Sequence, residues 1–412
     1  MNRAKQFEIS QTIFRDAFER VKANRGAAGV DNQSIHEFER DLEKNLYKLW
    51  NRMSSGTYFP PAVKSVEIPK KDGGKRILGV PTVADRVAQM VVKLYLEPEV
   101  EPMFHEDSYG YRPGKSALDA VARARRRCME NGWVLDLDIK GFFDNLDHEI
   151  MMKMVKRHTQ ERWIILYVER WLKAPMQSQD GTLVSRDKGS PQGSVISPLL
   201  SNIYLHYAFD AWISTKSGAV RFERYADDIV LHCSSETQAK TMLSLITERF
   251  AECKLELHPE KTKIVFCKTS RRSGSYEHEQ FDFLGYTFRP RGAKDRHGAI
   301  FLGFLPAISN KAAVDIRERI RSWNINEDSH RSLEELAEFI NPIMRGWINY
   351  YGRFYRSEME PVFECLDRHL ITWAMRKYKP LRRCKKKTRL WFRTLARENR
   401  NLFAHWKFGA SF

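Results

Sequence analysis

The chain of 412 residues is 42% hydrophobic and 29% charged, which excludes a disordered chain and predicts two or three domains with buried cores. No run of about 18 apolar residues occurs, and this excludes a membrane-spanning helix. The formal net charge of +17 predicts a polyanionic partner, because each Lys or Arg that neutralises a phosphate releases counterions, although a merely basic soluble protein would carry the same charge.

The N-terminal region is predicted to form two amphipathic helices with a turn between them. Apolar residues recur at helical spacing from Ile9 to Val21 and again from Ile35 to Leu49. The glycines at 26 and 29 favour the turn, since glycine adopts positive φ without strain. The chain start lacks an apolar signal core and soon carries acidic residues, which favours an intracellular, cytoplasmic protein.

Residues 63–81 alternate as a strand does, turn at Lys-Asp-Gly-Gly and continue as a second strand, which predicts a β-hairpin with a basic tip. Core helices are predicted over 82–101 and 116–130. In the segment between these helices, two tyrosines beside Arg112 suit stacking on a single-stranded template, and they suit a simple capped turn equally well.

The segment 134–139 is apolar enough for a buried strand, yet it carries Asp136 and Asp138 where apolar residues belong. Burying a carboxylate without a partner is costly, so these acids are predicted either to pair with bases or to hold a metal ion. Helices are predicted to follow over 147–157 and 160–173.

A second acidic site lies where two β-forming runs meet, at Asp227 and Asp228. The flanking aromatic and branched residues favour strands and the Asp pair is compatible with a tight turn, which predicts a hairpin with two carboxylates at its tip. Acidic turns are common, so the pair alone is weak evidence. Adjacent carboxylates repel each other unless a cation holds them, however, and Asp138 and Asp227 are predicted to hold two Mg²⁺ ions. Such ions would activate a 3′-hydroxyl and stabilise a leaving pyrophosphate.

Three blocks of this sequence resemble reverse transcriptases in order and spacing. Tyr225-Ala226-Asp227-Asp228 resembles the active-site hairpin of that family, and Asp138 falls where the family has its other metal ligand. The segments 189–194 and 196–202 resemble the loop and helix that pack against the incoming nucleotide. The resemblance is closest to the reverse transcriptases encoded by group II introns, which also act as maturases.

This resemblance implies a catalytic centre of Asp138, Asp227 and Asp228, with Ile139 as a further metal contact. Asp138 and Asp227 would be the direct ligands of the metal, and Asp228 would support them. Phe143 matches the family position whose ring crowds the 2′-carbon of the nucleotide and so favours dNTP over NTP.

The same resemblance assigns the other substrate contacts. The predicted nucleotide-binding residues are Lys70 and Arg76 on the triphosphate, Gln192 through its amide, and Lys261 near the departing pyrophosphate. Lys71 or Lys75 could take the place of Lys70, and a lone lysine such as Lys261 is as often structural. The predicted template and primer contacts are Arg112 and Gly285. Ser194 departs from the family, which often has a second glycine there and hence a different backbone path.

The C-terminal third is predicted to be helical. After a helix over 236–253 and a strand pair over 281–288, four apolar stripes from about residue 305 predict helices only. The segment 341–352 resembles the thumb or maturase part of the intron family. The last 32 residues, 381–412, carry ten Lys or Arg against one acid, and their interleaved aromatic residues predict contact with nucleic acid: Trp391, Phe392, Phe403, Trp406 and Phe408.

The sequence therefore predicts an α+β, right-hand polymerase with an antiparallel palm sheet. The expected divisions are an N-terminal helical extension (1–60), fingers and palm (61–300), a helical thumb or maturase domain (301–380) and a basic tail (381–412). Its expected partners are group II intron RNA, an RNA template, a DNA primer or target, and dNTPs. Cysteines without a CxxC pair indicate reduced thiols, and no Cys-pair with a His-Asn-His cluster follows, which predicts the endonuclease-lacking type.

Two other functions fit the same residues. One is a domesticated reverse transcriptase with a host role such as defence, and the other is a non-catalytic RNA-binding splicing factor. Intact acids in both acidic segments argue against the second.

Overall fold

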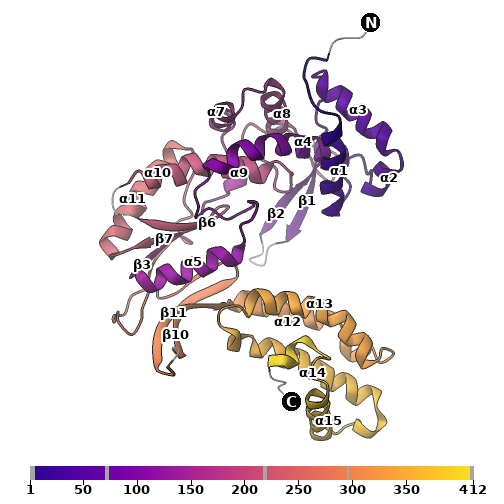
Figure 1. The fold of residues 1–412 in the computed structure, drawn as a ribbon, viewed down its shortest axis with the longest axis vertical. Coiled ribbons are helices and arrows are strands. Elements are labelled where there is room, and N and C mark those ends of the chain that lie inside the picture. The colour runs from indigo at the N-terminus through magenta and orange to yellow at the C-terminus, as the bar shows by residue number, and fades with distance from the viewer. Residues whose placement is uncertain (1–4, 70–73, 217–219, 295–296, 409–412) are drawn as a thin grey trace. The chain divides into compact units, whose positions relative to one another are not determined.

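The computed structural model describes residues 5–69, 74–216, 220–294 and 297–408. The chain divides into two compact units, coloured along the sequence in Figure 1. The first unit comprises residues 1–116, 135–231 and 237–263, and the second comprises 117–134, 232–236 and 264–412. None of the helices in these described ranges has the length and hydrophobicity needed to cross a bilayer.

The N-terminal part of the first unit contains three helices: α1 (Thr12–Ala23), α2 (Ile35–Arg40) and α3 (Leu42–Ser54). The single helix predicted over 35–49 is wrong, since Asp41 has φ −115° and ψ 39° and interrupts it. Ser34 and Glu37 begin α2 with a reciprocal capping box. The buried face of α1 packs against α4 (Val83–Val100), as Figure 1 shows.

A four-stranded sheet follows in the order β2-β1-β4-β5. The predicted hairpin is confirmed as β1 (Val63–Pro69) and β2 (Lys75–Val80), which pair antiparallel with Glu67 opposite Ile77. The short strands β4 (Met176–Gln177) and β5 (Leu183–Val184) complete the sheet. We call it the hairpin sheet.

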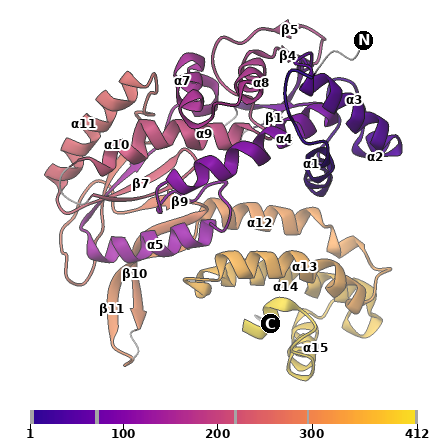
Figure 2. The ribbon, with the colours of Figure 1, turned by 45° about the horizontal axis from the view of Figure 1, so that its top comes forward.

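Helices make up most of the first unit's core. They are α4, α6 (Phe142–Asn145), α7 (His148–His158), α8 (Arg162–Lys173), α9 (Ser197–Leu205), α10 (Ala211–Ser214) and α11 (Glu236–Glu252). Helix α7 packs against both α8 and α9 (Figure 2). A π-helical turn, His206–Asp210, joins α9 to α10.

The central sheet has the strand order β6-β7-β3-β8. Its strands are β6 (Arg221–Tyr225), β7 (Asp228–Cys233), β3 (Trp133–Leu137) and β8 (Lys263–Phe266), and the chain passes from one unit to the other within the last three. The side chains of Leu135, Ile229 and Val230 are fully buried, as their apolar runs predict. Strands β7 and β3 are neighbours in this sheet, so the segment that carries Asp138 lies beside the one that carries Asp227 and Asp228.

The second unit contains α5 (Ala117–Glu130) and a three-stranded sheet in the order β11-β10-β9. Strands β9 (Phe281–Phe283) and β10 (Tyr286–Lys294) confirm the predicted strand pair. Strand β11 (Ile300–Ile308) lies where helices were expected to begin, so that expectation was wrong for its last residues. It pairs antiparallel with the whole of β10.

The rest of the second unit is a helical bundle of α12 (Asn310–Ser322), α13 (Leu333–Tyr351), α14 (Glu360–Lys377) and α15 (Lys385–Glu398). The second predicted stripe, from Leu333 to Ile340, and the third up to Tyr351 form one helix, α13, which continues through Pro342.

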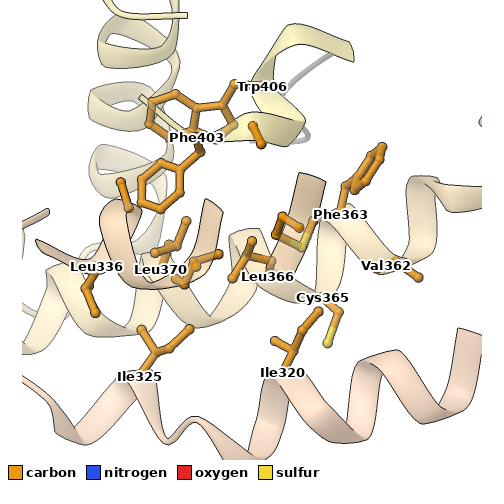
Figure 3. Close-up of a cluster of buried hydrophobic side chains, with 14 of the residues drawn as sticks. Ile320, Ile325, Leu336, Val362, Phe363, Cys365, Leu366, Leu370, Phe403 and Trp406 are labelled. Carbon is orange, nitrogen blue, oxygen red and sulfur yellow. The ribbon is translucent and has the colours of Figure 1, made fainter. Parts of the chain in front are cut away.

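The residues after 380 belong to this bundle and are not a separate tail. Phe392, Phe403 and Trp406 are at most 2% exposed and lie in one core with α13 and α14, as Figure 3 shows for Phe403 and Trp406. The Asn341 amide donates to the Leu402 carbonyl (2.8 Å) and accepts from the Ala404 N–H (2.8 Å). The predicted nucleic-acid contact is therefore wrong for these three aromatic rings, whose surface is taken up by packing.

Candidate active site

The hairpin between β6 and β7 turns at Ala226 and Asp227, one residue earlier than the Asp pair itself. Ala226 has φ +56°, a conformation that residues with a Cβ adopt rarely. Asp227 is half-buried in the turn, while Asp228 is exposed at the first position of β7.

A neighbouring segment lies against this turn. The Tyr109 N–H donates to the Arg224 carbonyl (2.8 Å), and the Arg224 N–H donates to the Asp107 carbonyl (2.9 Å). A Cβ on Gly110 would lie 2.4 Å from the Ala226 nitrogen, so only glycine permits this approach.

Asp138 comes directly after β3, the strand beside β7. Its carbonyl accepts from the His258 N–H (2.8 Å), and Ile139 forms an antiparallel bridge with Leu257. This pairing carries Lys261 to the site, where its Nζ lies 3.7 Å from Asp138 Oδ2. The Ile139 side chain is buried, so only its main chain could contact a metal.

The carboxylates at the turn are poorly neutralised. Burial raises the pKa of Asp227, as does the charge of Asp138, against the opposing effects of its backbone hydrogen bond, Arg76 and Arg224. Asp228 is exposed, yet protein atoms crowd around it. This desolvation, together with repulsion from Asp227 and Asp138, raises the pKa of Asp228 to about 7. The charge of Lys261 opposes the rise. Asp138 thus lies close enough to act on both residues of the hairpin.

This donor set suits a hard divalent cation, because carboxylate oxygens are the ligands that Mg²⁺ prefers and their repulsion favours added positive charge. In the part of the chain that the structure describes, no three His, Cys, Asp or Glu side chains have the geometry of a metal site. The Asp138 carboxylate is instead turned towards Lys261. The residues therefore fit the metal by chemistry and location.

Two of the predicted nucleotide contacts meet at one place. Arg76 Nε donates to Gln192 Oε1 (2.6 Å), and the Gly79 N–H donates to the Gln192 carbonyl (2.7 Å). Gly193 has φ +111°, and a Cβ there would lie 2.7 Å from the Gly79 carbonyl oxygen. Strand β2 is thereby fixed to the 189–193 loop, and Arg76 lies near enough to the β6–β7 turn to lower the pKa of Asp227 against the effect of burial.

Phe143 lies at the other end of the same loop. Its carbonyl accepts from the Ser190 N–H (2.7 Å), and its ring packs edge-on against Phe142 with 5.3 Å between centroids. Lys70, the partner predicted for Arg76, lies outside the described residues.

The predicted template and primer contacts lie elsewhere. The Arg112 guanidinium is buried, pairs with Glu101 (2.8 Å) and donates to the His105 and Ser108 carbonyls. Its template contact stays a prediction, since this geometry gives the side chain a structural role. Gly285, in the second unit, has φ +79° in the β9–β10 turn, and a Cβ there would meet the Tyr351 ring at 3.2 Å.

A support beneath the nucleotide loop was missed at the level of sequence. Gln89 Oε1 accepts from the N–H groups of Val195 (2.9 Å) and Ile196 (3.3 Å), and Gln89 Nε2 donates to Asp85 (2.9 Å). Asp85 also accepts from Tyr58 and Trp171, both at 2.7 Å. The available signal was the spacing of Asp85 and Gln89, which lie four positions apart among the apolar residues of α4.

Comparison with known proteins shows the family of the chain. The family model described as "Reverse transcriptase (RNA-dependent DNA polymerase)" matches residues 68–288, more than half of the chain, and the chain belongs to that family. A second model, "Group II intron, maturase-specific domain", matches residues 314–391. The chain is a group II intron reverse transcriptase with a maturase domain, and the second match extends past residue 380 into the segment predicted as a tail.

Similar proteins come from bacteria and yeast. The "Group II intron-encoded protein LtrA" of Lactococcus lactis subsp. cremoris is 31% identical over 49% of this chain and 33% of its own length. "Protein YkfC" of Escherichia coli (strain K12) is 32% identical over 57% of this chain and 71% of its own length. The "Uncharacterized 91 kDa protein in cob intron" of Schizosaccharomyces pombe is 25% identical over 90% of this chain and 54% of its own length. The matched region spans only about a third of LtrA.

Proposed function

We propose that this protein is an RNA-directed DNA polymerase that joins deoxynucleotides with two Mg²⁺ ions held by Asp138, Asp227 and Asp228. Members of its family generally use a divalent metal. The observation that carries the proposal is that β3 and β7 are neighbours in the central sheet, with Asp138 directly after β3 and Asp228 at the start of β7, although these acids lie 90 positions apart in the sequence. On this proposal the hairpin sheet corresponds to the fingers, the central sheet to the palm and the helical bundle to the thumb.

The metal ions, when bound, would lower the pKa of the primer 3′-hydroxyl and offset charge on the leaving pyrophosphate. The protein's own residues bind and orient the nucleotide. Arg76, exposed beside Gln192, offers its guanidinium to the triphosphate, and the glycine-flanked loop at 192 lets the backbone approach a base pair. Lys261 can exchange its contact with Asp138 for the pyrophosphate.

We further propose that the protein binds group II intron RNA and assists its splicing and mobility. The maturase-specific match over 314–391 supports this role, and LtrA is by name a group II intron-encoded protein. Helix α15 presents Lys385, Lys386, Arg389 and Arg393 on its exposed face, which suits a phosphate backbone.

Primer extension on an RNA template with Mg²⁺ tests the polymerase. Wild type should extend the primer, and Asp227→Ala should lose activity by at least about 10³-fold, since a ligand essential to the reaction is removed. Asp180→Asn is a matched control, because Asp180 is also an aspartate in a hairpin turn but only accepts from Thr182. Equal activity of wild type and Asp227→Ala would contradict the proposal.

A further inference from the structure

A buried ion pair lies directly beneath the catalytic turn. The Arg224 guanidinium binds both carboxylate oxygens of Asp210, with Nε–Oδ1 at 2.7 Å and Nη2–Oδ2 at 2.6 Å, and both side chains are 0% exposed. Burying two charges costs much of their attraction in lost hydration, so such a pair is weak evidence for stability. Its other hydrogen bonds indicate what it does.

The remaining bonds of Arg224 lead to the turn. Nη1 donates to the Ala226 carbonyl (3.1 Å) and to Asn202 Oδ1 (3.0 Å). Asn202 Nδ2 in turn donates to the Gly110 carbonyl (2.8 Å), and Gly110 is the residue that abuts the Ala226 nitrogen. Arg224 and Asn202 thus join the two backbone segments that enclose the positive-φ residue before Asp227.

Local structure directs Asp210 and Asn202 to the same arginine. Residues eight apart on a regular α-helix are offset by about 80° around its axis. The π-helical turn His206–Asp210 is wider and reduces the rotation per residue, which lessens this offset. Such turns often occur at functional sites.

We propose that Arg224, Asn202 and Asp210 are positioning residues that hold the Ala226 turn and thereby set where the Asp227 carboxylate meets the metal. We call these three residues the brace. They contact neither substrate nor metal, and they act through the main chain of Ala226 and Gly110. The inference rests on the proposed polymerase function.

Asn202→Ala tests the brace without disturbing the ion pair. The affinity for Mn²⁺, measured by electron paramagnetic resonance, should fall by about 10-fold or more, as is usual for residues that orient metal ligands. The Mg²⁺ concentration for half-maximal primer extension should rise by a similar factor of about 10. The KM for dNTP should change less than the metal requirement, because the side chains of Arg76 and Gln192 are left in place. Tyr204→Phe is the matched control, because it also removes a buried hydrogen bond from α9 (2.6 Å), but the partner is the Cys253 carbonyl and not the β6–β7 turn.

Wild-type metal affinity in Asn202→Ala, or an equal loss in Tyr204→Phe, would overturn the proposal. If Asn202→Ala does not fold, Arg224→Lys replaces it, since lysine keeps the charge but cannot reach Asp210 and Ala226 together, and the same shift is expected. The Mn²⁺ affinity needs no turnover. If the wild type showed no polymerase activity, the proposed function would be contradicted. The Mn²⁺ affinity of Asn202→Ala would still test the role of the three positioning residues.

Discussion

Single residues at the candidate active site show how its charges are arranged. Asp227 and Asp228 lie in surroundings that raise their pKa, while the cations nearby are shared with other partners: Arg76 with Gln192, Arg224 with Asp210, and Lys261 with Asp138. A divalent cation at this site would offset the repulsion between the carboxylates and favour their ionised form.

The sequence could single out these acids as candidates, because a carboxylate within an apolar run needs either a base or a metal ion beside it. Their binding of metal stays a prediction. The brace could not, since an arginine in an alternating strand shows no sign of facing inward. For Arg112 a charged side chain beside tyrosines suggested nucleic acid, yet its bonds to Glu101 and two carbonyls bury it.

Phe143→Ala should relax the choice of sugar. Removing the ring opens space beside the 2′-carbon, so incorporation of rNTP relative to dNTP should rise by about 10-fold or more. Phe142→Ala, which removes the adjoining ring, should lower stability without changing this ratio. Steady-state incorporation of each nucleotide measures the ratio, and an unchanged ratio in Phe143→Ala would refute the steric role.

Asp85 should make stability depend on pH. Burial raises its pKa from 3.8 to about 6 against the hydrogen bonds from Tyr58, Trp171 and Gln89, so the folded state favours the protonated form. Its contribution to stability is therefore full below pH 3.8 and is lost as the pH rises through about 6. Relative to Asp85→Asn, the wild-type free energy of unfolding should fall by about 2 kcal/mol between pH 4 and 7.

Urea unfolding of both proteins at several pH values measures this difference. A gap that stays constant from pH 4 to 7 would show that Asp85 does not titrate in this range.

At the scale of elements, local patterns predicted most helices and the β1–β2 hairpin but misjudged three boundaries. Asp41 interrupts a continuous apolar stripe, α13 continues through Pro342, and β11 forms in an apolar run before α12. In each case tertiary packing decided between local structures that the sequence pattern allowed. Aromatic residues among cations are typical both of nucleic-acid binding and of an amphipathic helix, and for Phe392 the second holds.

Trp406→Ala should therefore destabilise the helical bundle. The indole is 2% exposed and packs on Phe403 with 4.8 Å between ring centroids, so its removal should cost about 3–5 kcal/mol of unfolding free energy. Phe408→Ala is the control, because that ring is 39% exposed and should cost less than about 1 kcal/mol. Similar small losses for both, measured by chemical denaturation, would mean that the segment after 380 is not part of the core.

At the scale of the whole molecule, the net charge of +17 is concentrated in the last 32 residues, where ten Lys or Arg face a single acid. The packing of the aromatic residues orders this charge along α15 instead of leaving it on a loose tail. Sequence composition predicted the charge but could not predict that a folded helix would present it.

Removing positive charge from α15 should weaken the salt dependence of RNA binding. For Lys386→Gln with Arg393→Gln, the slope of log K against log salt should fall by about 0.7–0.9 for each phosphate that the variant no longer neutralises. Lys153→Gln with Lys156→Gln removes equal charge from the exposed face of α7 and should change the slope less. Equal slopes for the two double variants would show that only net charge matters.

The proposed function depends on Asp138 and Asp227 binding the same metal ions. Backbone cleavage by bound iron tests this directly. Fe²⁺ in place of Mg²⁺, with ascorbate and peroxide, produces radicals that cut the backbone beside the metal. We predict fragments from cuts near Asp138 and near Asp227 in the same sample, both suppressed by excess Mg²⁺ and both lost in Asp227→Asn. Cuts at only one of these segments, or cuts that Mg²⁺ does not suppress, would contradict the account.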